Sequence, residues 1–193
     1  MDLTQGTEEE KVVRAKKMML WFGIVSLTMG FAGWTSAYIV SSKREDWISD
    51  LELPQAFFVS TAIIILSSIT YWMAKASIKK ENQKQATIFL TTTLALGITF
   101  IVLQFIGFSQ MLKNGYYFTG PTSNIKMSYV FLLAAVHIAH VLAGLITLLV
   151  VMVQQLRGKY TSGKMLGLEL GATFWHFLDF IWVYLILFMY FMK

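Results

Sequence analysis

Residues 170–192 read LGATFWHFLDFIWVYLILFMYFM, an apolar stretch of membrane-spanning length that nevertheless carries His176 and Asp179. Glu169 directly precedes this stretch, and Thr173 lies one helical turn further on. The intervals of four, three and three residues place these four side chains on one side of a helix. Because a charged group at bilayer depth costs roughly 3 kcal/mol or more, we expect that side to face protein rather than lipid.

The composition is that of an integral membrane protein. Of the 193 residues, 56% are hydrophobic and only 14% are charged, whereas a soluble domain is about one quarter charged. The chain has no cysteine, which excludes a disulfide framework, a thiolate metal site and a cysteine nucleophile. The net charge of +5 reflects how basic residues are placed during membrane insertion, so we expect no nucleic-acid partner.

Five segments are apolar over the roughly 20 residues that a helix needs to cross a membrane. They are 18–40, 55–74, 86–112, 127–153 and 170–192. The short connections predict an all-α, antiparallel bundle of five transmembrane helices in one domain, 18–193, preceded by a cytoplasmic tail, 1–17. Thr7 and Glu10 match a capping box, so we expect a short polar helix that runs from the tail into the first span.

The basic residues predict which way the bundle is inserted. Eleven fall on one side of the membrane: Lys11, Arg14, Lys16, Lys17, Lys75, Lys79, Lys80, Lys84, Arg157, Lys159 and Lys164. Five fall on the other side: Lys43, Arg44, Lys113, Lys126 and Lys193. Since the more basic side stays in the cytoplasm, we expect a cytoplasmic N-terminus and an external, periplasmic C-terminus.

Two histidines, His137 and His140, lie three residues apart in the fourth span, and Gly144 follows on the same face. One interpretation is a metal or haem site that His176 completes from the last span. The fourth span has no His-Glu-x-x-His pattern and no nearby acidic ligand, so we favour interhelical hydrogen bonding, with Gly144 permitting close helix approach. We expect no metal site and find no catalytic residue.

The polar group Glu169, His176 and Asp179 also has two interpretations. Chains of acidic residues and histidines relay protons in pumps, but the last span carries few polar residues beyond Phe180. We therefore favour a structural cluster that pins the last two helices together.

Other residues within the spans predict contacts between helices. Gln104, in the middle of the third span, should hydrogen-bond to a neighbouring helix. Trp175 and Trp182 are seven residues apart, which favours side-chain packing over a cofactor site. A stripe of small residues predicts close packing of the first span: Ser26, Gly30, Gly33, Ser36 and Ala37.

Two motifs in the last third of the chain resemble subunit III of the haem-copper cytochrome c oxidases. Residues 136–144, VHIAHVLAG, resemble the His-x-x-His-Val stretch of that family. Residues 167–182, GLELGATFWHFLDFIW, resemble its closing signature, a Glu followed by Trp-His-Phe-x-Asp-x-x-Trp. The order of the two motifs and the number of residues between them also resemble that family. A weaker likeness covers the chain from Met18 onward and includes Gln104.

The resemblance implies the five-helix form of subunit III that many bacteria have, which lacks the first two helices of the seven-helix form. It implies a non-catalytic subunit of a terminal oxidase that reduces oxygen and pumps protons in the bacterial cytoplasmic membrane. Such a subunit docks on subunit I beside other oxidase subunits, holds structural phospholipid, and supports proton uptake and stability. Haem and copper stay in the partner subunits. The electron donor, the haem type and membership of a supercomplex remain open.

Phospholipid is expected at the inner rim, where cationic side chains attract headgroups and aromatic rings favour the interface. The residues expected to bind it are Lys16, Lys17, Lys75, Lys79, Arg157 and Trp175. Two positions depart from the family pattern, since Leu27 and Gly107 stand where many members carry a carboxylate. A direct part for those carboxylates in oxygen or proton handling therefore does not carry over.

Three other functions stay open. A subunit III-like accessory protein of a nitric oxide reductase would share the five-helix pattern. A haem-b membrane anchor would use His137 or His140 together with His176. A small transporter would need a discontinuous helix or an internal repeat, and the sequence has neither pattern.

Overall fold

The computed structural model describes residues 6–45, 47, 53–120 and 123–192, and this part of the chain forms a bundle of five helices. Each helix is long and apolar enough to cross a membrane. The helices are α1 (Glu8–Ser41), α2 (Gln55–Lys79), α3 (Gln83–Lys113), α4 (Ile125–Leu156) and α5 (Leu166–Phe191). The predicted all-α bundle of five spans is confirmed.

Helices α1, α3 and α4 begin at a residue whose side chain accepts from a backbone N–H of the first turn. The capping box of α1 is present: the Thr7 hydroxyl accepts from the Glu10 N–H, and the Glu10 carboxylate accepts from the Thr7 N–H. Helix α1 is therefore continuous from Glu8, and the last ten residues of the expected tail are helical. Helix α5 starts at Leu166, four residues before the predicted span. Apolar periodicity locates the membrane core and not the helix end, and no side-chain cap at Met165 marks the start of α5.

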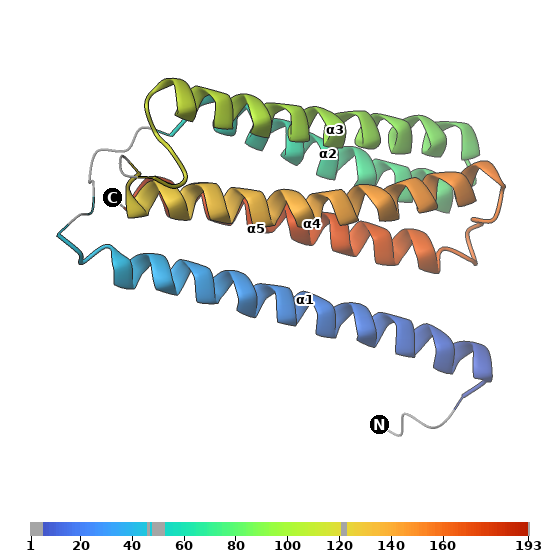
Figure 1. Ribbon diagram of the computed structural model, residues 1–193. Helices are drawn as coiled ribbons and strands as arrows, with labels where there is room; N and C mark the ends of the chain where they lie inside the picture. Colours follow the sequence, from blue (N-terminus) through green and yellow to red (C-terminus); the bar gives the residue numbers. More distant parts are fainter. Residues whose placement is uncertain (1–5, 46, 48–52, 121–122, 193) are drawn as a thin grey trace.

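Figure 1 shows α2, α3, α4 and α5 packed side by side, with α1 along one side of this group. Helix α1 contacts α4 and α5, and α2 packs along α3 over much of its length. The start of α1 and the end of α5 lie toward opposite ends of the bundle, as an odd number of antiparallel helices requires (Figure 1).

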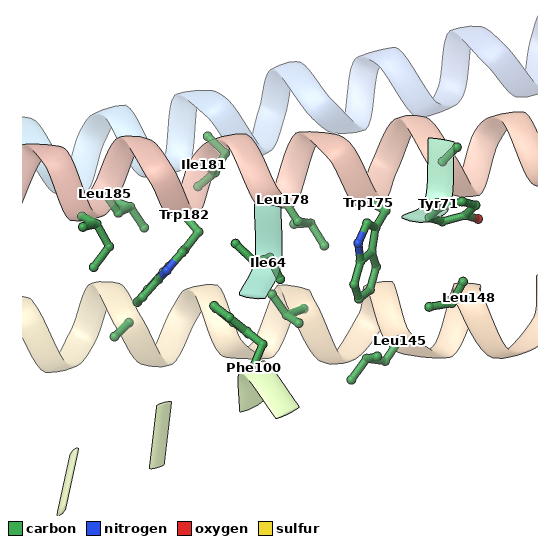
Figure 2. Close-up of a cluster of buried hydrophobic side chains, with 14 of the residues drawn as sticks. Ile64, Tyr71, Phe100, Leu145, Leu148, Trp175, Leu178, Ile181, Trp182 and Leu185 are labelled. Carbon is green, nitrogen blue, oxygen red and sulfur yellow. The ribbon is translucent and has the colours of Figure 1, made fainter. Parts of the chain in front are cut away.

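The core of the bundle is built around two indoles of α5. Figure 2 shows Trp175 and Trp182 reaching from α5 into the space beside α4, and each is at most 1% exposed. Glycines make room for them: a Cβ added at Gly97 would lie 2.8 Å from the Trp175 ring, and one at Gly144 would lie 2.8 Å from Leu178. Since lipid is as apolar as the core, tight packing of this kind holds membrane helices together. The predicted packing roles of Gly144 and both tryptophans are confirmed.

The small-residue stripe of α1 is not packed against the described residues, contrary to the sequence-based expectation. A Cβ added at Gly30 or Gly33 would meet no described atom within 4 Å. Helix α1 instead buries the face that carries Ile24, Phe31 and Tyr38. Phe31 contacts the His137 and His140 rings, and Tyr38 contacts Phe188, so aromatic contacts fix the rotation of this helix.

Candidate functional site

A line of polar side chains runs along α5 from one end of the bundle toward its middle. At the end, the Glu169 carboxylate lies 3.4 Å from the Lys17 ammonium of α1 and 3.7 Å from the Lys75 ammonium of α2. One turn inward, the Thr173 hydroxyl donates to the Glu169 carbonyl oxygen at 2.9 Å. Glu169 therefore joins three helices at the end where the basic loops gather.

His176 and Asp179 continue this line. The His176 Nδ1 lies 2.5 Å from the Ser68 hydroxyl of α2. Asp179 is only 5% exposed, and neither of its carboxylate oxygens has a hydrogen-bond partner among the described residues. The cluster predicted to pin α4 to α5 instead ties α5 to α2, because this face of α5 is turned toward α2.

Within the described part of the chain, the predicted interhelical hydrogen bonds of His137 and His140 are not formed. His137 is fully buried, stacks on Trp182 with ring centroids 5.1 Å apart, and has no hydrogen-bond partner among the described residues on either ring nitrogen. Phe31 and Phe100 enclose the same ring. The Nδ1 of His140 lies 2.7 Å from the carbonyl oxygen of Val136, in its own helix. The two histidines therefore contribute to aromatic packing and local backbone contacts.

Hydroxyl groups of α2 make several of the polar contacts between the described helices. Gln104 of α3 donates to Ser60 at 2.9 Å, which is the contact predicted from the sequence. The Trp175 indole donates to Ser67 at 2.9 Å, and the Trp182 indole donates to Thr61 at 3.0 Å. Sequence analysis missed these serines and the threonine as partners. Their signal was a pair of polar residues that recurs after seven positions, Ser60–Thr61 and Ser67–Ser68, on either side of five apolar residues.

A cleft separates the first half of α1 from α4 and α5. Its outer part has a volume of about 960 Å³, and charged residues of α1 and of the α4–α5 loop line it. Its inner part has a volume of about 430 Å³ and an almost wholly apolar wall that includes Leu20, Ile146, Val150 and Phe174. Tyr160 borders both parts, and burial raises the pKa of its hydroxyl. The cleft therefore has charged residues at its opening and an apolar interior.

The basic residues expected to bind lipid are only partly gathered at this cleft. Lys16 and Lys17 line its mouth, together with Lys159 and Lys164, which were not among the residues expected to bind lipid. Lys75 reaches an adjoining cavity of about 220 Å³, and Arg157 reaches a shallow apolar groove beside α4. The expectation that Trp175 touches lipid is wrong, because its ring is buried between α2, α3 and α4.

The three histidines are not arranged as one set of ligands. His137 packs against α1, α3 and α5, whereas His176 faces α2. Among the described residues, no three His, Cys, Asp or Glu side chains gather as metal ligands would. Gly107 packs against the Phe57 ring, so a longer side chain there would displace this aromatic residue.

Comparison with known proteins gives one family. The family model for cytochrome c oxidase subunit III matches residues 4–193. Subunit 3 of the cytochrome bo(3) ubiquinol oxidase of Pseudomonas aeruginosa is 36% identical over 68% of this chain and 61% of its own length. The corresponding protein of Buchnera aphidicola is 25% identical over 97% of this chain and 92% of its own.

Relatives outside the ubiquinol oxidases match as well. Cytochrome c oxidase subunit 3 of Coturnix japonica is 31% identical over 74% of this chain, and the match covers 51% of that protein. The chain thus spans only about half to three fifths of several curated relatives. The family match nevertheless covers nearly the whole chain, including both motifs of the last third. This five-helix membrane protein therefore belongs to the cytochrome c oxidase subunit III family.

Proposed function

We propose that this chain is the non-catalytic subunit III of a bacterial haem-copper terminal oxidase, docked on subunit I. The observation that carries the proposal is the family match over residues 4–193. Relatives named as subunits of a ubiquinol oxidase and of cytochrome c oxidases support it. The N-terminus is cytoplasmic in this proposal, because the basic loops follow the positive-inside rule.

In this proposal the haems and copper are held by partner subunits. The support is chemical: His137 is caged by aromatic rings, and His140 and His176 are engaged with different partners. The purified full chain is therefore expected to give no Soret absorption at near-stoichiometric intensity. A strong Soret band would favour a haem-b anchor instead.

The cleft beside α1 is the proposed site for a structural phospholipid. Its apolar interior suits an acyl chain, and the lysines at its mouth suit a headgroup phosphate, each contributing about 1 kcal/mol near the surface. Native mass spectrometry tests this with the Lys16→Gln, Lys159→Gln double variant, which should retain less phospholipid than wild type. The matched control is Lys80→Gln, Lys84→Gln, which removes two exposed charges at the same end of the bundle but outside the cleft. Equal retention in both variants contradicts the site.

The subunit is proposed to stabilise the oxidase and to support its proton supply rather than to react with oxygen. An oxidase purified without this chain, with its haem content confirmed, should turn over at first and then lose activity or take up protons more slowly. Immediate and complete loss of oxygen consumption in the haem-loaded complex contradicts a non-catalytic role. Copurification with nitric oxide reductase subunits in place of oxidase subunits would assign the chain to that complex.

A further inference from the structure

One face of α5 is left open over most of the length of the helix. Its residues follow one another at intervals of four, three, four, four and three, which keeps side chains on one side of a helix. They are Glu169, Thr173, His176, Phe180, Tyr184 and Leu187. None of the six is buried, and Phe180 is 69% exposed. These six residues are called the open stripe of α5 below.

The open stripe lies between α1 and α2, which do not close over it. Both helices pack on α5, but among the described residues the backbones of α1 and α2 do not approach each other. Toward α1, the Tyr184 hydroxyl donates to the Thr35 hydroxyl at 3.3 Å. Toward α2, the His176 ring bonds to the Ser68 hydroxyl. The stripe is therefore held on both sides and remains accessible from outside the bundle.

The middle of the open stripe carries a polar atom that no described residue satisfies. His176 lies ten residues after the first residue of α5, so it is about 15 Å along the helix and near the centre of a bilayer about 30 Å thick. Its Nδ1 bonds to Ser68, whereas its Nε2 has no hydrogen-bond partner in the described part of the chain. Acyl chains offer no hydrogen bond, and polar groups at this depth face protein. A side chain of another protein therefore suits the Nε2.

The basic end of the open stripe has one positive charge in excess. The ammonium groups of Lys17 and Lys75 lie 3.4 Å and 3.7 Å from the Glu169 carboxylate, and with it they line the cavity of about 220 Å³ between α1, α2 and α5. Two ammonium groups thus share one carboxylate. None of the three side chains is buried, so a further acidic side chain can reach them. This end suits a partner that brings an Asp or Glu to the membrane surface.

We propose that the open stripe of α5 is the docking surface for one transmembrane helix of a neighbouring subunit. Alternating intervals of three and four residues are typical of helix seams, in which the side chains of one helix fit between those of another. The partner helix packs against Phe180 and Leu187 and presents a hydrogen-bonding side chain to His176. It ends with an acidic residue beside Lys17 and Lys75. The inference rests on the proposed function, because it takes the chain to be one subunit of a membrane complex.

Photocrosslinking in the assembled complex tests this surface. p-Benzoylphenylalanine in place of Phe180 should crosslink, in intact membranes, to a transmembrane helix of a subunit that copurifies in equal amount with this chain. The matched control is the same analogue in place of Phe105 on α3, which is 59% exposed and should give no crosslink to that helix. Crosslinks from Phe180 to lipid alone, or to a second copy of this chain, overturn the docking surface while the complex stays intact. If no other subunit copurifies, the proposed function fails and the docking surface fails with it.

Two tryptophans of α1 provide a matched pair of substitutions beside the open stripe and away from it. Trp21 lines the cavity at the basic end, whereas Trp34, thirteen residues further on, points about 140° away from it around the helix. Both are exposed, so neither Trp21→Ala nor Trp34→Ala should change the melting temperature of the full chain in detergent.

Retention of the two variants by the complex is then measured after dilution in detergent. Trp21→Ala should weaken retention at least tenfold, because it removes an aromatic contact beside the docked helix, and Trp34→Ala should leave retention unchanged. Retention that does not differ between the two variants, or that is lower for Trp34→Ala, overturns the proposal. The second result would place the partner on the small-residue side of α1 instead.

Discussion

His137 of α4 and Trp182 of α5 stack deep in the bundle, with ring centroids 5.1 Å apart and ring planes inclined by 27°. The histidine ring is completely buried, and neither nitrogen has a hydrogen-bond partner among the described residues. The pair therefore stabilises the bundle through aromatic packing, and the imidazole nitrogens add no hydrogen bond among the described residues. This sets His137 apart from His176, whose ring bonds to another helix.

The two histidines should accordingly differ in their tolerance to leucine. His176→Leu removes the contact with Ser68 and should lower the free energy of unfolding by about 0.6–1.7 kcal/mol, as interhelical hydrogen bonds in membranes do. His137→Leu loses a stacking contact of about 0.5–1.5 kcal/mol but also removes two unsatisfied polar atoms, so its net effect should be smaller. Thermal unfolding in detergent measures both variants. A larger loss for His137→Leu than for His176→Leu contradicts the assignment.

The glycines of α3 and α1 provide a matched pair of substitutions. Gly97→Ala places a methyl group 2.8 Å from Leu145 and from the Trp175 ring, and should cost about 1–3 kcal/mol through overpacking. Gly30→Ala meets open space among the described residues and should leave the stability of the isolated chain unchanged or slightly higher. Melting temperatures of the two variants in one detergent check this. A loss in Gly30→Ala equal to that in Gly97→Ala would mean that the stripe on α1 packs after all.

Glu169 should control how firmly the first half of α1 is held. Its contacts with Lys17 and Lys75 lie at the open end of the cleft, whereas the other end of α1 is tied down by the bonds from Tyr38 to Met192 and from Ser41 to Tyr129. Such partly exposed ion pairs contribute only about 0–1 kcal/mol, so Glu169→Gln should loosen the helix without unfolding the chain.

Pulsed electron spin resonance measures this loosening. Spin labels at Glu9 and Lys164, across the mouth of the cleft, should show a broader distance distribution in Glu169→Gln than in wild type. Labels at Ile39 and Phe191, exposed near the opposite end, serve as the control and should show no change. Broadening at the control pair as well would indicate general loss of structure rather than release of α1.

The orientation of the bundle can be tested cleanly because the chain has no native cysteine. A single Lys80→Cys variant lies at the basic end, after α2, and should react with a membrane-impermeant thiol reagent only when the cytoplasmic side is open. Lys113→Cys lies at the opposite end, at the end of α3, and should react in intact cells. The reverse labelling pattern would invert the proposed topology.

The sequence by itself determined the number of spans, their approximate positions and the family. These depend on properties that one helix carries alone: twenty apolar residues must cross the bilayer as a helix, and a short motif keeps its identity wherever the helix packs. Spacing along α5 also placed Glu169, Thr173, His176 and Asp179 on one side correctly, because the geometry of a helix is fixed. The capping box at Thr7 was readable for the same local reason.

Only the tertiary structure decided what each side faces. In a membrane protein several faces of a helix are equally apolar, so hydrophobic periodicity does not predict which face packs against which neighbouring helix. The rotation of α5 turns His176 toward Ser68 of α2 rather than toward α4, and it places Trp175 in the core rather than at the lipid interface. The small-residue stripe of α1 faces outward for the same reason. The contacts of Phe31 and Tyr38, on the other side of α1, fix the rotation of that helix. Residue spacing within one helix does not predict which distant segments its side chains pack against.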